Sequence, residues 1–314
     1  MSTTDPTAPE PPGPVPGTDA ATARLLDELA ANATVAPLTR LTDGWLCKAA
    51  PDLPFRRANA VLPPTGAGAD PRATAAALDA IEAWYRGFGQ RVLVQVSSAD
   101  PAASALDELL DRRGYVVEAP VDLLVAETER IAEAGTRALE ALLVDLDEEP
   151  AGATGEAPTV EVAVDGGDDE AWARRYGALH GDDDVWRART EAYGQMLGVL
   201  GPGIVRATVL IHGADGGPVG AAGPAPVTAD AIGVGFAVLE RGWAGIYGMG
   251  TAVAWRRRGV GGALLGGLAV EARRRHGTHL YLQVERDNDA AQALYRGLGF
   301  AEHHGYHYRV GRPA

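Results

Sequence analysis

Three consecutive arginines (residues 256–258) lead into a Gly-Val-Gly-Gly run (residues 259–262) at the junction between two segments. Residues 244–253 have the pattern of a strand, and the helix-like segment after the glycines ends near Gly277. Glycine lets a backbone come close to a ligand, and the first N–H groups of a helix have no intrahelical partner. The helix dipole also favours an anion at that end. The junction therefore predicts a strand–turn–helix unit that binds an anionic group.

A second motif follows on the next helix-like segment. It reads Asn288-x-x-Ala291-x-x-Leu294-Tyr295-x-x-x-Gly299-Phe300. The Arg-x-x-Gly-x-Gly spacing of the first motif and this second motif resemble the GNAT superfamily of acetyl-CoA-dependent N-acetyltransferases, in the expected order and on the expected elements. A dinucleotide-binding fingerprint would need a third glycine at position 264, which is leucine. The alternative reading is that the glycines only permit tight packing of strand and helix.

The resemblance implies a fold, a co-substrate and a set of binding residues. The fold is α/β (a mixed α+β sheet), mostly antiparallel, with helices on both faces, and the co-substrate is acetyl-CoA without a metal. In this family the loop wraps the cofactor diphosphate, while the preceding strand and the second motif bind the pantetheine arm. The residues at these positions are Met249, Thr251, Val253, Arg256, Arg257, Arg258, Gly259, Val260, Gly261, Gly262, Ala263 and Asn288.

Catalytic roles follow for two side chains and one backbone group. Tyr295 matches the general acid of the family, because a phenol with a pKa near ~10 can return a proton to the departing thiolate. The backbone N–H of Thr251 stands where the family stabilises the acetyl oxygen. The general base is less constrained, and Glu285 is the choice because it leaves the strand that carries Gln283. The alternatives are Glu240, Tyr247, the acidic run at residues 182–184 and an ordered water.

The chain also carries a degenerate internal repeat with an offset of about 190 residues. Residues 93–96 resemble residues 281–284, but the first copy has Pro71 in place of Gly259 and Asp100 in place of Asn288. This predicts a tandem GNAT similar in layout to those of actinobacteria, with convergent α/β patterning as the alternative. The expected parts are a disordered tail (1–19), a degenerate N-terminal domain (20–126), a connector and linker (127–158) and a catalytic domain (159–314).

Composition narrows the class of protein. The formal net charge of −14 over 314 residues argues against a sequence-independent nucleic-acid binder and is compatible with a cationic amine substrate. No apolar run reaches 18 residues, and the N-terminus lacks the basic start of a signal peptide. Cys47 is the only cysteine, which excludes an internal disulfide and a multi-cysteine zinc site. We expect a cytoplasmic protein without membrane or nucleic-acid partners. The sequence leaves open whether it forms a homodimer.

The sequence therefore predicts an N-acetyltransferase that moves an acetyl group from acetyl-CoA directly to a primary amine in a ternary complex. The acceptor would be a small molecule or a peptide. Transfer of another acyl group is one alternative, because the loop would be the same. A non-catalytic CoA-binding sensor or scaffold is another. Three histidines near the C-terminus, His303, His304 and His307, are expected at the surface rather than in a metal site.

Overall fold

The computed structural model describes residues 19–53, 55–147, 159–165, 169–180, 184–212 and 231–312. The predicted tail up to residue 18, the linker at 148–158 and the acidic residues Asp182 and Asp183 lie outside these ranges.

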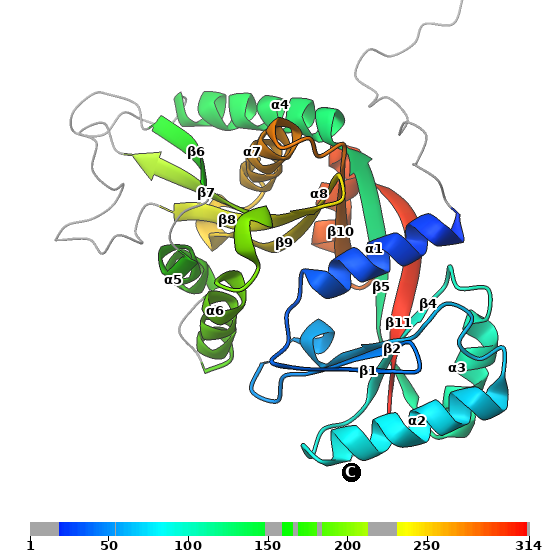
Figure 1. The fold of residues 1–314 in the computed structure, drawn as a ribbon. Helices are drawn as coiled ribbons and strands as arrows, with labels where there is room; N and C mark the ends of the chain where they lie inside the picture. The colour runs from blue at the N-terminus through cyan, green and yellow to red at the C-terminus, as the bar shows by residue number, and fades with distance from the viewer. Residues whose placement is uncertain are drawn as a thin grey trace, which may run out of the picture.

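The described strands form one continuous sheet in the order β1-β2-β3-β4-β11-β5-β10-β9-β8-β7-β6 (Figure 1). Only the pairs β3–β4 and β9–β10 are parallel, so the sheet is mostly antiparallel, as predicted. The strands are β1 (Leu38–Thr42), β2 (Trp45–Ala49), β3 (Ala60–Leu62), β4 (Leu93–Ser97), β5 (Val116–Glu127), β6 (Thr159–Asp165), β7 (Ile204–His212), β8 (Ala231–Glu240), β9 (Trp243–Thr251), β10 (His279–Glu285) and β11 (Ala301–Val310).

The two halves of the chain exchange their last strands. β5 closes the N-terminal half along the chain, yet it lies between β11 and β10 of the C-terminal half. β11 ends the C-terminal half, yet it also pairs with β4 of the N-terminal half. Each half thus supplies a strand to the sheet of the other, and the sheet runs through both without a break.

Helices cover both faces of this sheet, as the pattern predicts (Figure 1). They are α1 (Ala20–Asn32), α2 (Pro71–Arg86), α3 (Ala103–Arg112), α4 (Thr128–Asp147), α5 (Asp169–His180), α6 (Asp184–Leu197), α7 (Val260–Arg274) and α8 (Asp289–Leu298). Over the C-terminal half, α4, α7 and α8 bury one set of strand residues, including Leu280 and Leu282. The alternate residue Tyr281 faces α1, α5 and α6 on the other side. Helices α2 and α3 pack on the N-terminal half.

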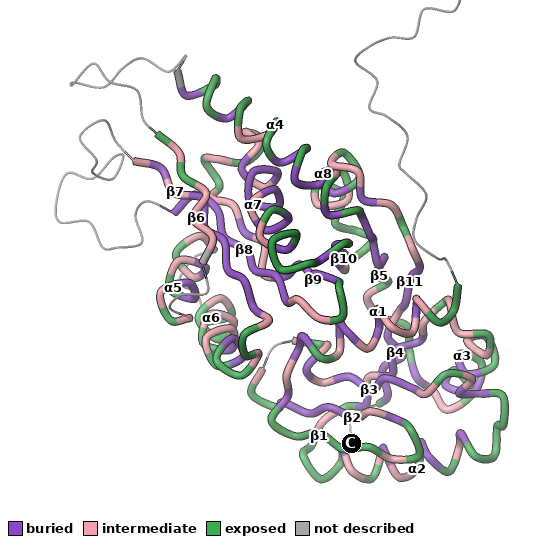
Figure 2. The backbone as a smooth tube through the Cα atoms, turned by 45° about the horizontal axis from the view of Figure 1, so that its top comes forward, coloured by how far each residue is buried: buried purple, intermediate pink, exposed green. Residues whose placement is uncertain are grey.

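The connector between the halves is the 20-residue helix α4, which packs along α7. Contact between the helices is close because two glycines meet: a Cβ added to Gly135 would lie 2.1 Å from the Cα of Gly266. Buried residues concentrate in the strands and on the inner faces of these helices (Figure 2). Within the described ranges, no helix is long and apolar enough to cross a membrane.

Candidate functional site

The central feature of the site is a split between β9 and β10. The two strands pair only from Trp243 opposite His279 to Ile246 opposite Leu282. Beyond that point β9 follows β8 as far as Thr251, and β10 follows β5. Neighbouring strands that part in this way leave a wedge in the sheet, whose edges present backbone N–H and C=O groups without a partner strand.

A β-bulge turns β9 away from β10. Between two paired positions, β8 has one residue, Gly235, where β9 has two, Gly248 and Met249. Gly248 has a φ of 60°, in the left-handed region that glycine adopts readily. Met249 packs into the core under α7. The bulge thus places the end of β9, with Thr251, at the mouth of the wedge.

Helix α7 begins directly beyond this mouth. Gly259 is its N-cap, with a φ of 87° and no side-chain capping bond. The first N–H to find a backbone acceptor is that of Ala263, bonded to the Gly259 carbonyl at 2.9 Å. The N–H groups of Val260, Gly261 and Gly262 therefore have no intrahelical acceptor. With Arg256 and Arg257 exposed beside them, this helix start fits an anion such as a diphosphate.

The glycines of the loop serve packing as well as ligand access. A Cβ at Gly259 would lie 2.9 Å from the carbonyl oxygen of Ala138 in α4, and one at Gly262 would lie 2.7 Å from the Cβ of Ala138. At Gly261 a Cβ would meet only a methyl group of Leu294, at 3.0 Å. Tight packing against backbone and Cβ atoms of α4 thus explains Gly259 and Gly262, whereas at Gly261 only the flexible end of the Leu294 side chain lies in the way.

The remaining predicted cofactor residues gather around the same place. Val253 lies in a short 3-10 turn after β9 and is 71% exposed, and Arg258 lies over the ring of Trp255 with 5.1 Å from the guanidinium carbon to the ring centroid. Asn288 caps α8, where its Oδ1 accepts the N–H of Ala291 at 3.2 Å. The helix-cap role of Asn288 is therefore present in the structure, and its contact with pantetheine stays a prediction.

Tyr295 lies on α8, on the same side of the sheet as α7. It is buried in the core cluster of this face and packs against Phe300 with 5.9 Å between ring centroids. Burial raises the pKa of its phenol to about 12. Tyr295 is thus protonated at neutral pH and can act as an acid.

On the opposite face, a cavity of about 420 Å³ opens beside the ends of β10, β5 and β11. Helix α6 and residues 55–57 of the N-terminal half complete it. Its lining residues are Phe55, Arg56, Arg57, Val121, Arg189, Tyr193, Gln283, Glu285, Tyr306 and Tyr308. This volume suits a small-molecule ligand.

Among the described candidates for the general base, the structure brings only Glu285 to this cavity, where it pairs with Arg56 at 3.0 Å. Glu240 lies at the opposite end of β9 from Thr251 and accepts hydrogen bonds from Asn32 at 3.1 Å. Tyr247 is buried and shares a hydrogen bond with the hydroxyl of Tyr281, and burial raises its pKa to about 12.

His180, at the end of α5, is a residue that sequence reasoning missed. Its ring lies against β9, so that a Cβ added to Gly250 would stand 2.5 Å from Cε1 and 3.1 Å from Nε2. Nδ1 donates to the Tyr176 carbonyl at 2.8 Å, which leaves Nε2 as the basic nitrogen. Burial lowers the pKa of His180, and the nearby charges of Arg189 and Arg256 lower it further. A lone histidine at a helix end carries no sequence signal that would have identified it.

The corresponding place in the N-terminal half is closed. Helix α2 starts with Pro71, which has no N–H, and the Asp70 carboxylate accepts the N–H groups of Arg72 and Ala73 at 2.9 and 3.1 Å. A carboxylate thus occupies the position where α7 would receive an anion. The Asp100 carboxylate, just before α3, also accepts the N–H of Gly66 at 2.9 Å, which holds the loop between β3 and α2 close to the start of α3.

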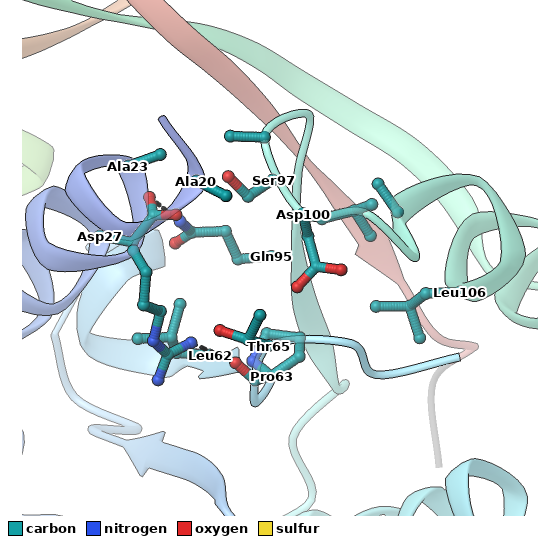
Figure 3. A pocket seen from close by; sticks show the side chains of 14 residues that line it. Ala20, Ala23, Asp27, Leu62, Pro63, Thr65, Gln95, Ser97, Asp100 and Leu106 are labelled. Atoms are coloured by element: carbon teal, nitrogen blue, oxygen red, sulfur yellow. Dashed lines mark hydrogen bonds between the residues drawn. The ribbon is translucent and has the colours of Figure 1, made fainter. Parts of the chain in front are cut away.

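What remains of this second site is a cavity of about 30 Å³, enough for about two water molecules (Figure 3). Asp27 and Gln95 are hydrogen-bonded to each other at its edge, at 2.9 Å. The N-terminal half therefore has the scaffold of the site without its anion-binding donors.

Neither the histidines nor the cysteine forms a further site. Within the described ranges, no group of three or more His, Cys, Asp or Glu residues could hold a metal ion. The expectation that the C-terminal histidines lie at the surface is wrong for His304, which is 6% exposed and within 3.3 Å of the buried Asp27. Cys47 is buried, and burial raises the pKa of its thiol to about 11.

Known proteins resemble this chain in the sequence of one segment and in the overall fold. Residues 182–300 match the family model described as Acetyltransferase (GNAT) family. A GCN5-related N-acetyltransferase from Kribbella flavida is similar in structure, with a TM-score of 0.58 at 16% identity over 96% of this chain and 97% of that one. A tandem GNAT protein from the clavulanic acid biosynthesis pathway gives a TM-score of 0.59 at 13% identity, over 97% and 91% of the two chains. At these identities the likeness shows the fold alone. No curated protein matches the chain by sequence.

Proposed function

We propose that this chain transfers an acetyl group from acetyl-CoA to a primary amine, because residues 182–300 match the GNAT family model and the fold is similar to that of a tandem GNAT protein. The observation that carries the proposal is the split between β9 and β10 next to the free N–H groups of α7. The split offers backbone partners to an extended amide chain such as pantetheine, and α7 offers donors to its diphosphate.

The proposed reaction is direct transfer in a ternary complex. The backbone N–H of Thr251 stabilises the oxygen of the acetyl carbonyl as the amine attacks. The amine proton passes to a base on the cavity side, and Tyr295 gives its phenolic proton to the departing thiolate. Residues 249–263 and Asn288 hold the co-substrate. We also propose that the protein works in the cytoplasm.

The proposal is tested by isothermal titration of the protein with acetyl-CoA, followed by measurement of free-thiol release with a panel of primary amines. Binding and amine-dependent thiol release support it. Binding without release by any amine would favour a CoA-binding sensor, and a faster reaction with a longer acyl-CoA would correct the choice of acyl group.

Replacement of Tyr295 by phenylalanine is expected to lower kcat by about 100-fold and to leave the Kd for acetyl-CoA nearly unchanged. The reason is that the substitution removes only the hydroxyl, the proton donor, while the buried ring keeps its packing against Phe300. Steady-state kinetics and titration calorimetry on the same preparation measure both quantities. An unchanged kcat would exclude Tyr295 as the acid that governs the rate.

We propose His180 as the base, with Glu285 as the competing assignment. Because burial lowers the pKa of His180, its Nε2 is free at neutral pH. We expect kcat/KM to fall on the acid side, at a pH below the ordinary histidine pKa of about 6.5.

The variants His180→Gln and Glu285→Gln decide between these two assignments. The base is the residue whose replacement removes the acid limb of the pH profile and lowers kcat/KM by about 100-fold. We expect this result for His180→Gln and a smaller loss with an unaltered profile for Glu285→Gln. The reverse pattern would assign the base to Glu285.

A further inference from the structure

The cavity beside β10 contains hydrogen-bond donors that have nothing to donate to. Tyr308 is 1% exposed and lines the cavity, and its buried hydroxyl, which interacts with the hydroxyl of Tyr306, forms no well-aligned hydrogen bond in the described part of the chain. The same holds for Nε2 of Gln283 and Nε of Arg189. A buried polar group without a hydrogen-bond partner destabilises the folded protein, so three such groups in one cavity point to a ligand that satisfies them.

The orientation of the Gln283 amide is fixed by its neighbour. Arg57 donates from its Nη1 to Oε1 of Gln283. Since a guanidinium has only donors, the amide must turn its oxygen to Arg57, and its NH₂ group is left as the unpaired donor. The ligand must therefore bring acceptor atoms rather than donors to this wall of the cavity.

The cavity also holds positive charge that no described carboxylate pairs with. Arg56 is compensated by Glu285 at 3.0 Å. Arg57 and Arg189 instead lie against aromatic rings. The guanidinium carbon of Arg57 is 5.5 Å from the ring centroid of Tyr247, and that of Arg189 is 4.9 Å from the ring centroid of Trp186. Neither forms an ion pair with any carboxylate of the described ranges. Aromatic rings stabilise a cation without cancelling its charge.

We propose that the acceptor is an amino carboxylate, whose carboxylate binds between Arg57, Arg189, Gln283 and Tyr308. This inference rests on the proposed function, because it names the acceptor of that same site. Guanidinium groups and a phenol are the donors that bind a carboxylate well. The local charge is thus opposite to that of the whole chain, whose net charge of −14 is compatible with a cationic amine.

The rest of the lining favours a free amino acid or a similarly small molecule. The cavity volume of about 420 Å³ holds a ligand of this size. Phe55, Tyr193 and Tyr306 supply ring surface for an apolar side chain. The amino group of the ligand then lies toward the end of β10, next to the split in the sheet.

The test compares matched acceptors in the thiol-release assay: phenylalanine with phenethylamine, leucine with isoamylamine and lysine with cadaverine. We expect kcat/KM to be at least about 100-fold higher for the better amino acids than for their decarboxylated partners. Phenylalaninamide should behave like phenethylamine. Equal rates within each pair would overturn the inference and leave the proposed function standing, whereas failure of acetyl-CoA to bind would overturn the proposed function itself.

Two variants locate the carboxylate. Tyr308→Phe removes only the hydroxyl and keeps the buried ring, so the fold should be unaffected, yet kcat/KM for an amino acid should fall about tenfold while that for its decarboxylated amine stays constant. Arg189→Gln should lower kcat/KM for the amino acid by about 10- to 100-fold and likewise leave kcat/KM for the decarboxylated amine constant. Arg112→Gln, which removes an exposed arginine on α3 remote from the cavity, is the matched control.

The phosphonate analogue of phenylalanine provides a separate arm of the experiment. A rate above that of phenylalanine would overturn the assignment of a carboxylate, because phosphonate would then be the preferred anion. A loss in Tyr308→Phe or Arg189→Gln that is equal for the amino acid and the amine would also contradict it, since the residue would then act on fold or amine position.

Discussion

A Gly261→Glu variant is expected to bind acetyl-CoA at least about 100-fold more weakly than the wild-type protein. The glutamate would stand in the first turn of α7, beside the free N–H groups of Val260, Gly261 and Gly262. Its carboxylate would compete for these donors and repel a diphosphate at short range. Titration calorimetry with acetyl-CoA measures the effect directly.

Gly297→Glu is the matched control for this variant. Gly297 lies on the exposed side of α8, and a Cβ added there has no atom within 4 Å. It introduces the same charge without entering the loop, so we expect wild-type affinity. Because a Cβ at Gly261 meets only a movable methyl of Leu294, the fold of the Gly261 variant should survive, and a thermal unfolding curve checks this. If Gly261→Glu bound acetyl-CoA with wild-type affinity, the diphosphate could not bind at the N-terminus of α7.

The local elements around the site follow closely from the sequence. The helix-like segment that carries the second motif is α8, because Asn288 caps its start and Gly299, with a φ of 108°, ends it. The predicted strand–turn–helix unit likewise appears as β9, the glycine turn and α7. Short-range signals of this kind depend on a few neighbouring residues, so a single sequence carries them.

The pairing between strands that are distant along the chain has no such signal in the sequence. The valines of β5 and the tyrosines of β11 favour a strand in each segment, but they do not show which neighbours the strand has. β1 was not predicted, because four of its five residues are exposed and it lacks a buried face. The division at residue 159 stays a prediction, and a chain cut there would lose both β5 beside β10 and α4 over α7.

The acceptor cavity could not be predicted from the sequence for the same reason. Arg57, Arg189 and Tyr308 come from three segments more than 100 residues apart, and the fold alone brings them to one cavity. Residues from the N-terminal half therefore reach the proposed site of reaction. This gives the half without an anion site a direct part in acceptor binding.

Replacement of Gly135 by alanine is expected to lower the free energy of unfolding by about 3–5 kcal/mol. The added Cβ would stand 2.1 Å from the Cα of Gly266 and 2.9 Å from the Gly262 carbonyl oxygen, so only a separation of α4 from α7 could relieve the overlap. That separation would open the core between the connector helix and the helix that carries the cofactor loop. Urea unfolding of both proteins under identical conditions measures the difference.

The same substitution at Gly194 should act in the opposite direction. Gly194 lies inside α6, and an added Cβ there would have its nearest neighbour, the Cβ of Ala173, at an ordinary 3.8 Å. Because alanine favours a helix interior over glycine, Gly194→Ala should raise stability by up to about 1 kcal/mol. Equal stability of Gly135→Ala and the wild-type protein would mean that α4 does not lie against α7 at this distance. It would also remove the contact between Ala138 and Gly259 that holds the cofactor loop against the connector helix.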